Sequence, residues 1–345
     1  MIKIGIIGAG GYAGETLVGL LLRHPEVKIE WLMSEPAHKG LPISELYPHL
    51  KGETDLVCLE INKSKISEVD LVYLAMPHGI GFEYVKEAIS KGKKVIDLSA
   101  DFRLHNVAVY EKWYVKHTEP GLLAEAVYGL PELHLEEIKK AKIVANPGCY
   151  TTASILALAP LAKEKLIDLS SIGIDAKSGV SGAGIKLTRA THFSDANEGV
   201  TPYSALTHRH TPEIDQELSL LAGKEVKISF IPHLIPMTRG ILSTCYTKSI
   251  KKVSQKEIID LYKEFYKNSV FVRIFDGDKL PSTKYVYGTN YCDIAVRVNQ
   301  ETDQIIVFSA VDNLVRGASG QAVHNMNTMY GFPEKTGIDS VAVYP

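Results

Sequence analysis

One cysteine in this sequence stands where a nucleophile could be activated. Cys149 follows a short apolar run at 142–145 and a Pro-Gly turn, and a stretch with helical spacing follows it from 151 to about 165. A helix N-terminus presents partial positive charge, which stabilises a thiolate. Cys149 is therefore the candidate nucleophile. The other cysteines lie in strand-like sequence, which favours buried, inert thiols: Cys58, Cys245 and Cys292.

Two histidines could supply the acid/base partner that a thiol nucleophile needs. The segment 207–213 reads Thr-His-Arg-His-Thr-Pro-Glu and contains His208, His210 and Glu213. In an extended segment the two imidazoles would share one face, although both could simply pack in the core. An H-x-H pair can also chelate zinc, but a third ligand with suitable spacing is missing, so we predict no metal. Glu213 could orient an imidazole or bind a substrate amine or amide.

A glycine-rich turn near the N-terminus suits a phosphate. Gly8, Gly11 and Gly14, with Gly10 adding freedom, separate the β-branched run Ile2–Ile7 from a helical pattern at 15–23. Such a turn lets a pyrophosphate approach the backbone at a helix N-terminus. The spacing G-x-x-G-x-x-G departs from the usual G-x-G-x-x-G, so another phosphate ligand, or a turn without any ligand, stays open.

The end of the next predicted strand indicates which dinucleotide binds. An acidic residue there would hold the ribose hydroxyls of NAD, but Glu30 lies early in the strand and can face elsewhere. Ser34, with Lys39 nearby, would instead suit a 2′-phosphate, whereas Glu35 opposes it. These residues favour NADP over NAD.

Further anion sites are predicted in the second half of the chain. The segment 177–184 reads Lys-Ser-Gly-Val-Ser-Gly-Ala-Gly, and its hydroxyls and exposed amides suit phosphate, although a flexible loop is the alternative. Arg103 and Arg239 stand beside turn-like residues and could clamp a carboxylate or phosphate, unless they are merely solvated.

These parts together indicate one reaction type. A nicotinamide does not readily deliver hydride to a carboxylate, whereas a thiolate can displace phosphate from an acyl phosphate and leave a reducible thioester. A nucleotide site, a thiolate, a histidine and anion sites are what this chemistry needs. A non-catalytic NADP-binding regulator is the alternative of a different class.

Composition is consistent with an enzyme of small molecules. The 345 residues suggest two domains, and 45% hydrophobic with 23% charged residues is typical of a globular protein and not of a fibrous or disordered one. A net charge of −2 disfavours nonspecific binding to nucleic acid or anionic membranes. We expect no transmembrane span, no signal peptide and no disulfide framework, which points to a cytoplasmic protein.

The hydrophobic patterns predict an α/β protein with two domains. Strands at 2–7, 27–33, 70–75, 93–98 and 142–145 alternate with helical patterns, which predicts a doubly wound parallel sheet. From Ile172 onward, strands at 227–231, 241–246, 292–298 and 304–311 indicate an α+β second domain. A long helix over Leu314–Tyr330 is expected to return to the first domain. The predicted domains are 1–148, completed by 314–345, and 149–313.

At this point the chain resembles the N-acetyl-γ-glutamyl-phosphate reductase family, which is related to aspartate-semialdehyde dehydrogenases. The resemblance spans essentially the whole chain and rests on segments at 8–14, 75–79, 97–104, 128–132, 146–152, 178–184, 208–214, 236–241 and 312–327. It implies NADPH-dependent reduction of N-acetyl-L-glutamyl 5-phosphate in arginine biosynthesis. The same chemistry on aspartyl phosphate, or on a carrier-linked aminoadipyl phosphate, is the nearest alternative, because one methylene gives little discrimination.

The resemblance also implies roles for individual residues. Cys149 is the acylated nucleophile, and His208, or else His210, is the acid/base. Residues 317–321 would contact the cofactor, and a homodimer or homotetramer is expected. Ile185, in place of a basic residue, and Arg316, where lysine is common, depart from the pattern. The predicted NADP(H) contacts are Gly8, Gly10, Gly11, Tyr12, Gly14, Ser34, Lys39, Pro77, Ser178, Gly179, Gly182 and Asn313. The predicted substrate contacts are Arg103, Ser181, Glu213 and Arg239.

Overall fold

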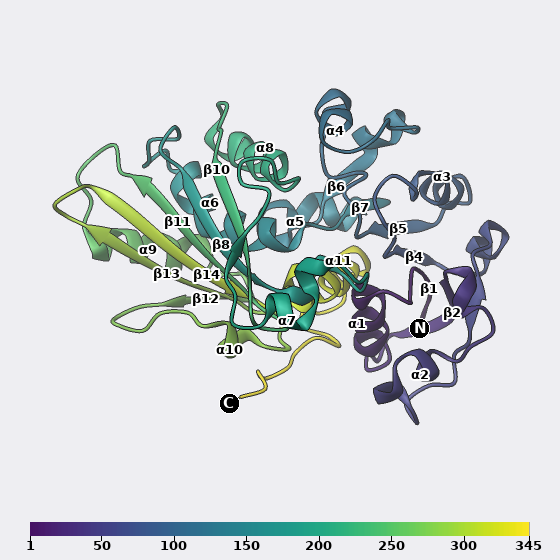
Figure 1. The fold of residues 1–345 in the computed structure, drawn as a ribbon. Helices are drawn as coiled ribbons and strands as arrows, with labels where there is room; N and C mark the ends of the chain where they lie inside the picture. Colours follow the sequence, from purple (N-terminus) through teal and green to yellow (C-terminus); the bar gives the residue numbers. More distant parts are fainter. Residues whose placement is uncertain (345) are drawn as a thin grey trace. The chain divides into compact units, whose positions relative to one another are not determined.

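The computed structural model describes residues 1–344, which divide into two compact units. Unit 1 comprises Met1–Gly148 and Ala318–Asp339. Unit 2 comprises Cys149–Gly317 and the C-terminal residues from Ser340. Figure 1 labels the elements of both units.

Unit 1 is built on a sheet in which every strand pairing is parallel. The strand order is β3-β2-β1-β4-β5-β7-β6. Parallel sheets bury both faces, which explains why β4 (Leu71–Leu74) is apolar and buried along its length. Position 5 in β1 accepts only glycine, because a Cβ there would lie 2.2 Å from the indole of Trp31.

The elements of unit 1 follow the chain in an alternating order. The strands are β1 (Ile2–Ile7), β2 (Val27–Ser34), β3 (Cys58–Glu60), β4, β5 (Lys94–Asp97), β6 (Ala126–Tyr128) and β7 (Ile143–Ala145). The helices are α1 (Tyr12–Leu21), α2 (Ile43–Leu46), α3 (Phe82–Ser90), α4 (Val107–Trp113), α5 (Pro131–Lys140) and α11 (Gly320–Tyr330), with a 3₁₀ turn η1 at Pro36–His38. Helix α11 packs against α1 and α5, so a distant part of the chain completes this unit.

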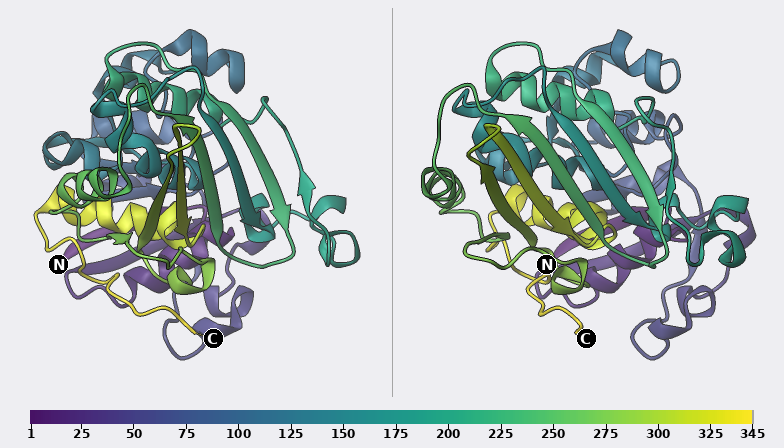
Figure 2. Two further views of the ribbon diagram at one scale, coloured as in Figure 1. Left: turned by 90° about the vertical axis from the view of Figure 1, so that its left-hand side faces the viewer. Right: turned by 60° about the vertical axis from the view of Figure 1, so that its left-hand side comes forward.

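Unit 2 combines a mixed sheet with a buried helix. The strand order is β12-β13-β14-β11-β8-β10-β9, with parallel pairing of β8 with β10 and of β12 with β13, and antiparallel pairing elsewhere. Helix α6 (Cys149–Lys163) is buried from Tyr150 to Ala162 because it packs against strands β11 and β14 and against helix α8. Figure 2 turns the broad face of this sheet toward the viewer, with helices behind it.

The remaining elements of unit 2 are as follows. The strands are β8 (Gly173–Gly179), β9 (Thr201–Pro202), β10 (Ser229–Ile235), β11 (Ile241–Lys248), β12 (Val272–Phe275), β13 (Cys292–Asn299) and β14 (Gln304–Val311). The helices are α7 (Phe193–Ala196), α8 (Thr211–Ala222), α9 (Gln255–Phe265) and α10 (Thr283–Val286). Among the described residues, no helix is both long and apolar enough to cross a bilayer.

The predicted fold class is confirmed, and two local expectations need correction. The long helix expected over Leu314–Tyr330 begins as a π-helix at Val315–Ser319 and becomes α-helical only at Gly320. The strand expected at 227–231 lies at Ser229–Ile235. The segment from Lys177, for which a flexible loop was the alternative interpretation, continues strand β8 as far as Gly179. A π-helical turn is frequently found at functional sites.

Candidate active site

The first turn of α6 carries the predicted nucleophile. Cys149 is the first residue of this helix, and its side chain is partly exposed. The other three cysteines are buried in β3, β11 and β13, as their sequence surroundings predicted. Burial raises the pKa of the Cys245 thiol to about 12 and also raises that of Cys58, so neither is a thiolate at neutral pH. Cys149 is thus the cysteine placed for nucleophilic chemistry.

The π-helix passes directly over this cysteine. A Cβ at Gly317 would lie 2.8 Å from the Cβ of Cys149 and 3.1 Å from its Cα, so any side chain at position 317 would push Cys149 aside. The Gly317 amide donates to the Asp312 carbonyl at 2.8 Å. Sequence inspection did not single out this steric role, because the two residues are far apart in the chain.

The two predicted histidines adjoin one another through a turn and not through an extended segment. Residues 208–210 lead into α8, and the imidazole centroids of His208 and His210 are 4.7 Å apart. The His210 amide donates to Nδ1 of His208 at 3.1 Å. In the neutral ring this hydrogen bond leaves the hydrogen on Nε2, so His208 presents a hydrogen-bond donor on its other side.

An aromatic enclosure surrounds His208. The rings of Tyr150, Tyr203 and Phe230 lie edge-on to its imidazole, at centroid distances of 5.6, 5.5 and 5.3 Å. Burial, together with the nearby Arg209 charge, lowers the pKa of His208 to about 4. His208 is therefore neutral at physiological pH in this structure.

The two tyrosines beside the histidine were not predicted. The Tyr203 hydroxyl donates to the Tyr150 hydroxyl at 3.0 Å, and Tyr150 donates in turn to the His233 carbonyl at 3.3 Å. Burial raises the pKa of Tyr203 to about 12 and that of Tyr150 further, so both hydroxyls keep their protons. The position of Tyr150 next to Cys149 is the only signal in the sequence that could have found it.

Glu213 is directed back toward α6. It lies in the first turn of α8, is 1% exposed, and accepts a hydrogen bond from the Thr151 hydroxyl at 2.8 Å. This contact joins the first turn of α6, which carries Cys149, to the first turn of α8, which follows His210. A carboxylate placed near a helix N-terminus is stabilised by the helix dipole.

The predicted anion-binding segment is organised by Asn313. Its Oδ1 accepts from the Gly240 amide at 2.7 Å, and its Nδ2 donates to the Ser181 hydroxyl at 2.9 Å. A Cβ at Gly182 would lie 2.9 Å from the Ser178 hydroxyl. These contacts gather Ser178, Ser181, Gly182 and Asn313 into one cluster of unit 2.

The backbone around the same cluster is close to the segment carrying Arg239. A Cβ at Gly179 would lie 2.7 Å from the Thr238 carbonyl oxygen, so this position needs a glycine. Arg239 is half-buried, and Ile185, which follows the cluster, is 46% exposed. Residues at the end of β8 and before β11 therefore meet here.

Arg103 lies in unit 1 and is far more buried than a solvated arginine. It is 4% exposed, and its guanidinium donates to the carbonyls of Asn146 and Leu98, both at 2.7 Å. It therefore fixes two backbone segments that follow β7 and β5. Its assignment as a substrate contact stays a prediction.

The glycine-rich turn of unit 1 has the shape that a phosphate requires. Gly8 has φ +96°, and a Cβ there would lie 2.3 Å from the Ala75 carbonyl oxygen. A Cβ at Gly14 would lie 2.2 Å from the Gly8 carbonyl oxygen. A Cβ at Gly11, by contrast, would meet nothing closer than 3.9 Å, which leaves space over the N-terminus of α1. The residues present thus fit a dinucleotide pyrophosphate.

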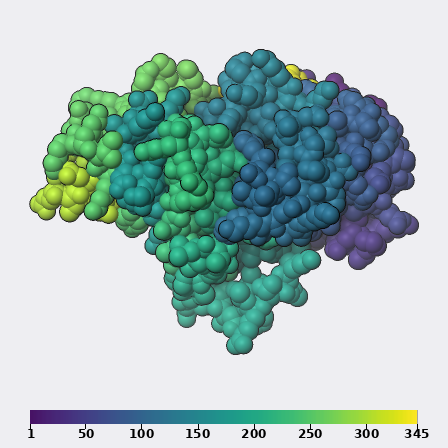
Figure 3. All heavy atoms as spheres, turned by 90° about the horizontal axis from the view of Figure 1, so that it is seen from above, coloured from purple at the N-terminus to yellow at the C-terminus, as the bar shows by residue number. Residues whose placement is uncertain are grey.

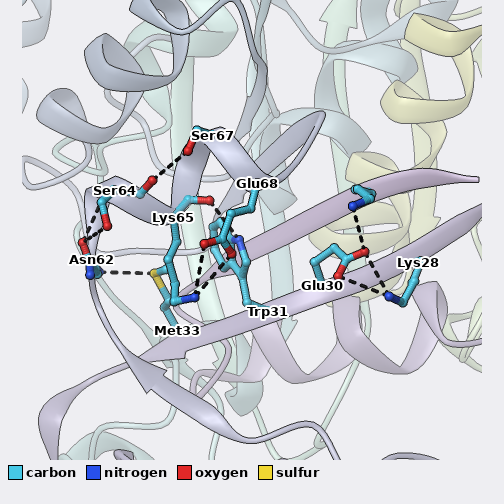
Figure 4. Close-up of polar contacts among 10 residues, drawn as sticks. Lys28, Glu30, Trp31, Met33, Asn62, Ser64, Lys65, Ser67 and Glu68 are labelled. Carbon is cyan, nitrogen blue, oxygen red and sulfur yellow. Dashed lines mark hydrogen bonds and ion pairs between the residues drawn. The ribbon is translucent and has the colours of Figure 1, made fainter.

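Other predicted cofactor residues of unit 1 surround this turn. Tyr12 begins α1 and is half-buried, and Pro77 is exposed after β4. Ser34 ends β2, whereas Lys39 follows η1 and forms an ion pair with Glu60 at 2.6 Å. Glu30 is directed to Lys28 at 3.0 Å and to Lys3 at 3.6 Å, and Figure 4 shows it beside Lys28 and apart from Asn62. The Glu30 carboxylate is therefore paired with lysines and is not directed toward a ribose site.

Comparison with known proteins identifies the family. Residues 3–141 match the family "Semialdehyde dehydrogenase, NAD binding domain", and residues 149–313 match "Semialdehyde dehydrogenase, dimerisation domain". The chain is 51% identical over 346 residues to N-acetyl-gamma-glutamyl-phosphate reductase of Pelotomaculum thermopropionicum, covering 100% of this chain and 99% of the relative. The chain belongs to the N-acetyl-gamma-glutamyl-phosphate reductase family. The enzyme of that name from Alkaliphilus metalliredigens is 52% identical, with 100% of both chains covered.

Solved structures of more distant proteins share the fold of this reductase family member. Aspartate semialdehyde dehydrogenase II of Vibrio cholerae, complexed with ASA, superposes with a TM-score of 0.74 at 17% identity and covers 96% of this chain and 98% of its own. Aspartate semialdehyde dehydrogenase with NADP from Candida albicans gives 0.71 at 14% identity, with 96% and 99% covered. Among the described residues, no group of three or more histidine, cysteine or acidic side chains is placed to hold a metal.

Proposed function

We propose that this chain reduces N-acetyl-L-glutamyl 5-phosphate with NADPH to N-acetyl-L-glutamate 5-semialdehyde and phosphate, a step of arginine biosynthesis in the cytoplasm. The observation that carries the proposal is the placing of Cys149 at the first turn of α6 in a chain about half identical to reductases of that name. Unit 1, completed by α11, binds the dinucleotide at Gly8–Gly14, and unit 2 carries the chemistry.

The first half-reaction forms a thioester. The Cys149 thiolate, stabilised by the N-terminus of α6, attacks the acyl carbon, so an S–C bond forms and the C–O bond to phosphate breaks. Phosphate leaves with the electron pair of that bond. The cluster of Ser178, Ser181 and Asn313, with Arg239 nearby, is proposed to bind anionic groups of the substrate and cofactor.

His208 is proposed to stabilise the negative charge that develops on the acyl oxygen. Its Nδ1 is occupied by the His210 amide, so the Nε2–H is the group available for the developing oxyanion in both tetrahedral intermediates. The dry aromatic surroundings strengthen that hydrogen bond, because water competes less. His210 and Glu213 are proposed to hold this histidine and the substrate in place.

The second half-reaction releases the aldehyde. When bound, NADPH supplies the hydride that reduces the thioester carbon. The resulting oxyanion on that carbon then expels the Cys149 thiolate as the S–C bond breaks, and the free aldehyde leaves. The thiolate is thereby restored for the next turnover.

The reverse reaction gives a direct test. We expect phosphate-dependent reduction of NADP⁺ by N-acetyl-glutamate semialdehyde, followed by NADPH absorbance, and abolished in Cys149→Ser. The control is Cys292→Ser, which removes a buried strand thiol and should leave the rate within about threefold. A preference for aspartate semialdehyde or the aminoadipyl homologue would move the assignment to that substrate. Binding of NADP⁺ without turnover of any aldehyde would favour the regulator.

We further propose that the protein forms a homodimer or homotetramer. Between β8 and α8 the chain projects from unit 2, as Figure 3 shows in teal, and exposes Leu187, Phe193 and Val200 at 100%, 76% and 63%. Apolar groups gathered on an exposed segment commonly mark an interface. Light scattering after gel filtration should give a multiple of 38.0 kDa, and a monomer would contradict this proposal.

A further inference from the structure

A relay of polar contacts closes the end of β2, next to the glycine-rich turn. The Ser34 hydroxyl lies 2.8 Å from Nδ1 of His38, and Nε2 of His38 lies 3.3 Å from a carboxylate oxygen of Glu35. Ser34 is 3% exposed and the His38 side chain is 21% exposed, whereas Glu35 is open to solvent at 68%. The relay therefore runs inward from a solvated carboxylate to a buried hydroxyl.

The relay is in contact with the turn that would hold the dinucleotide. A Cβ at Gly10 would lie 2.4 Å from the Ser34 hydroxyl and 2.6 Å from Nδ1 of His38. In a dinucleotide-binding fold, the end of this second strand is where the adenosine ribose is recognised. Ser34 and His38 thus lie where a 2′-hydroxyl or 2′-phosphate would be distinguished.

The other charged groups around His38 do not favour a phosphate by themselves. Lys39 is paired with Glu60 at 2.6 Å, and Glu35 adds a second carboxylate. Tyr47 donates to the Gly10 carbonyl at 2.9 Å and stays neutral, because burial raises its pKa to about 12. With a neutral His38, one cation faces two carboxylates, and a phosphate would meet net repulsion. A proton on His38 adds a second cation, which balances the charge of the two carboxylates.

Protonation of His38 also reverses the direction of the hydrogen bond between His38 and Ser34. When the hydrogen of the neutral ring is on Nε2, Nδ1 accepts the Ser34 hydrogen, and the Ser34 lone pairs remain for a donor such as a ribose hydroxyl. In the imidazolium, Nδ1–H donates to Ser34, and the Ser34 hydrogen is free for an acceptor such as a phosphate oxygen. One proton thus changes both the charge and the hydrogen-bond direction of the site.

We propose that His38 determines the choice between NADP(H) and NAD(H), with its protonated form selecting the 2′-phosphate through Ser34 and its neutral form accepting the 2′-hydroxyl. This inference deepens the proposed function and rests on it only in requiring that a nicotinamide dinucleotide binds at the Gly8–Gly14 turn. The cofactor preference therefore depends on pH through the proton of this imidazole.

Binding calorimetry tests the proposal without any turnover. We would measure the dissociation constants of NADP⁺ and NAD⁺ from pH 6.0 to 8.5 for the wild type and for His38→Gln, and form the NAD⁺/NADP⁺ ratio at each pH. The 2′-phosphate itself titrates near pH 6, so the decisive quantity is the wild-type ratio divided by the variant ratio, in which the ligand's own titration cancels. This quotient should fall about tenfold as the pH rises, as expected when one proton is linked to binding.

Matched variants separate the relay from neighbouring charge. His49→Gln removes another histidine–carboxylate pair of unit 1, with Glu15 at 2.7 Å, and should keep the wild-type pH dependence. Ser34→Ala should reduce the pH dependence but not abolish it, because the charge of the imidazolium remains. Lys39→Gln should lower NADP⁺ affinity and leave the pH dependence intact. If His38→Gln does not fold, Ser34→Ala and the proton uptake on NADP⁺ binding to the wild type decide. A constant quotient with tight NADP⁺ binding overturns this inference alone, whereas no binding of either dinucleotide overturns the proposed function as well.

Discussion

Replacing Gly317 by alanine should disable the nucleophile more than it destabilises the protein. The added methyl would lie 2.8 Å from the Cβ of Cys149, 3.1 Å from its Cα and 3.4 Å from the Asp312 carbonyl oxygen. Gly317 is buried, and α6 is buried from Tyr150 onward, so the two backbones have little room to move apart. The methyl can be accommodated only if Cys149 moves.

The size of the effect follows from the distances. Ordinary van der Waals contacts of a Cβ begin near 3.4 Å, so the two carbons must separate by about 0.6 Å, chiefly by displacing the first turn of α6. Inserting one methyl into a packed site costs about 1–3 kcal/mol of unfolding free energy. Misplacing a reacting atom by about 1 Å can cost about 100-fold in rate, so we expect kcat to fall about 10- to 100-fold.

The assay combines turnover with a direct probe of the thiol. The rate of Cys149 alkylation by iodoacetamide and kcat for the reverse reaction should both fall in Gly317→Ala, while the urea unfolding midpoint shifts only modestly. Gly173→Ala is the matched control, because Gly173 lies at the start of β8 in the same unit and a Cβ there meets nothing within 4 Å. If Gly317→Ala kept kcat and alkylation within twofold of the wild type, the steric reasoning would be refuted.

Three further predictions concern the turn, the histidine and Asn313. Gly14→Ala should lower both NADP⁺ affinity and thermal stability, because its Cβ would meet the Gly8 carbonyl oxygen at 2.2 Å. Gly11→Ala should weaken NADP⁺ binding at an unchanged melting temperature. Equal melting temperatures for the two variants would contradict this expectation. Because burial lowers the pKa of His208 from 6.5 to about 4, its contribution to stability is complete above pH 6.5 and is lost as the pH falls through 4. The difference corresponds to about 3 kcal/mol, so urea unfolding of His208→Gln should show that much less acid destabilisation by pH 4, and an equal acid sensitivity would refute it. Asn313→Ala leaves the buried Gly240 amide without its acceptor, so it should lower the unfolding free energy by about 1–3 kcal/mol in a urea titration. Asn313→Asp keeps that acceptor and should lower the unfolding free energy less.

The first unit was the easier part to predict. Its buried parallel strands are short apolar runs, and their alternation with amphipathic helices determines the class of fold. The second unit carried weaker signals, because β8 contains Asp175, Lys177 and two glycines and has no apolar run. Its pairing with β10 and β11 makes it a strand, which is a tertiary effect that local pattern does not contain.

Residue type and local turn geometry sufficed to predict Cys149 as the nucleophile but did not predict its surroundings. The cysteine was recognisable because a helix N-terminus is a local feature of the chain. Gly317 packs against Cys149, and Tyr203 forms a hydrogen bond with the neighbouring Tyr150. Both residues lie more than 50 positions away in the chain, and only the fold brings them to this site. His208 and His210 were found by spacing, but their juxtaposition through a turn depends on α8 beginning at Thr211.

The two predicted arginine clamps differ in their surroundings. Arg103 and Arg239 look equivalent in sequence, yet the first is 4% exposed and bonded to two backbone carbonyls, whereas the second is half-buried. A buried guanidinium must satisfy its donors inside the protein, so Arg103 has become part of the framework after β5 and β7. Lys39 and His38 differ in the same way: the exposed ion pair of Lys39 with Glu60 is weak and screened, while His38 is held by a buried hydroxyl. Specificity therefore depends more on the side chain whose proton and partners the fold controls than on the one with the permanent charge.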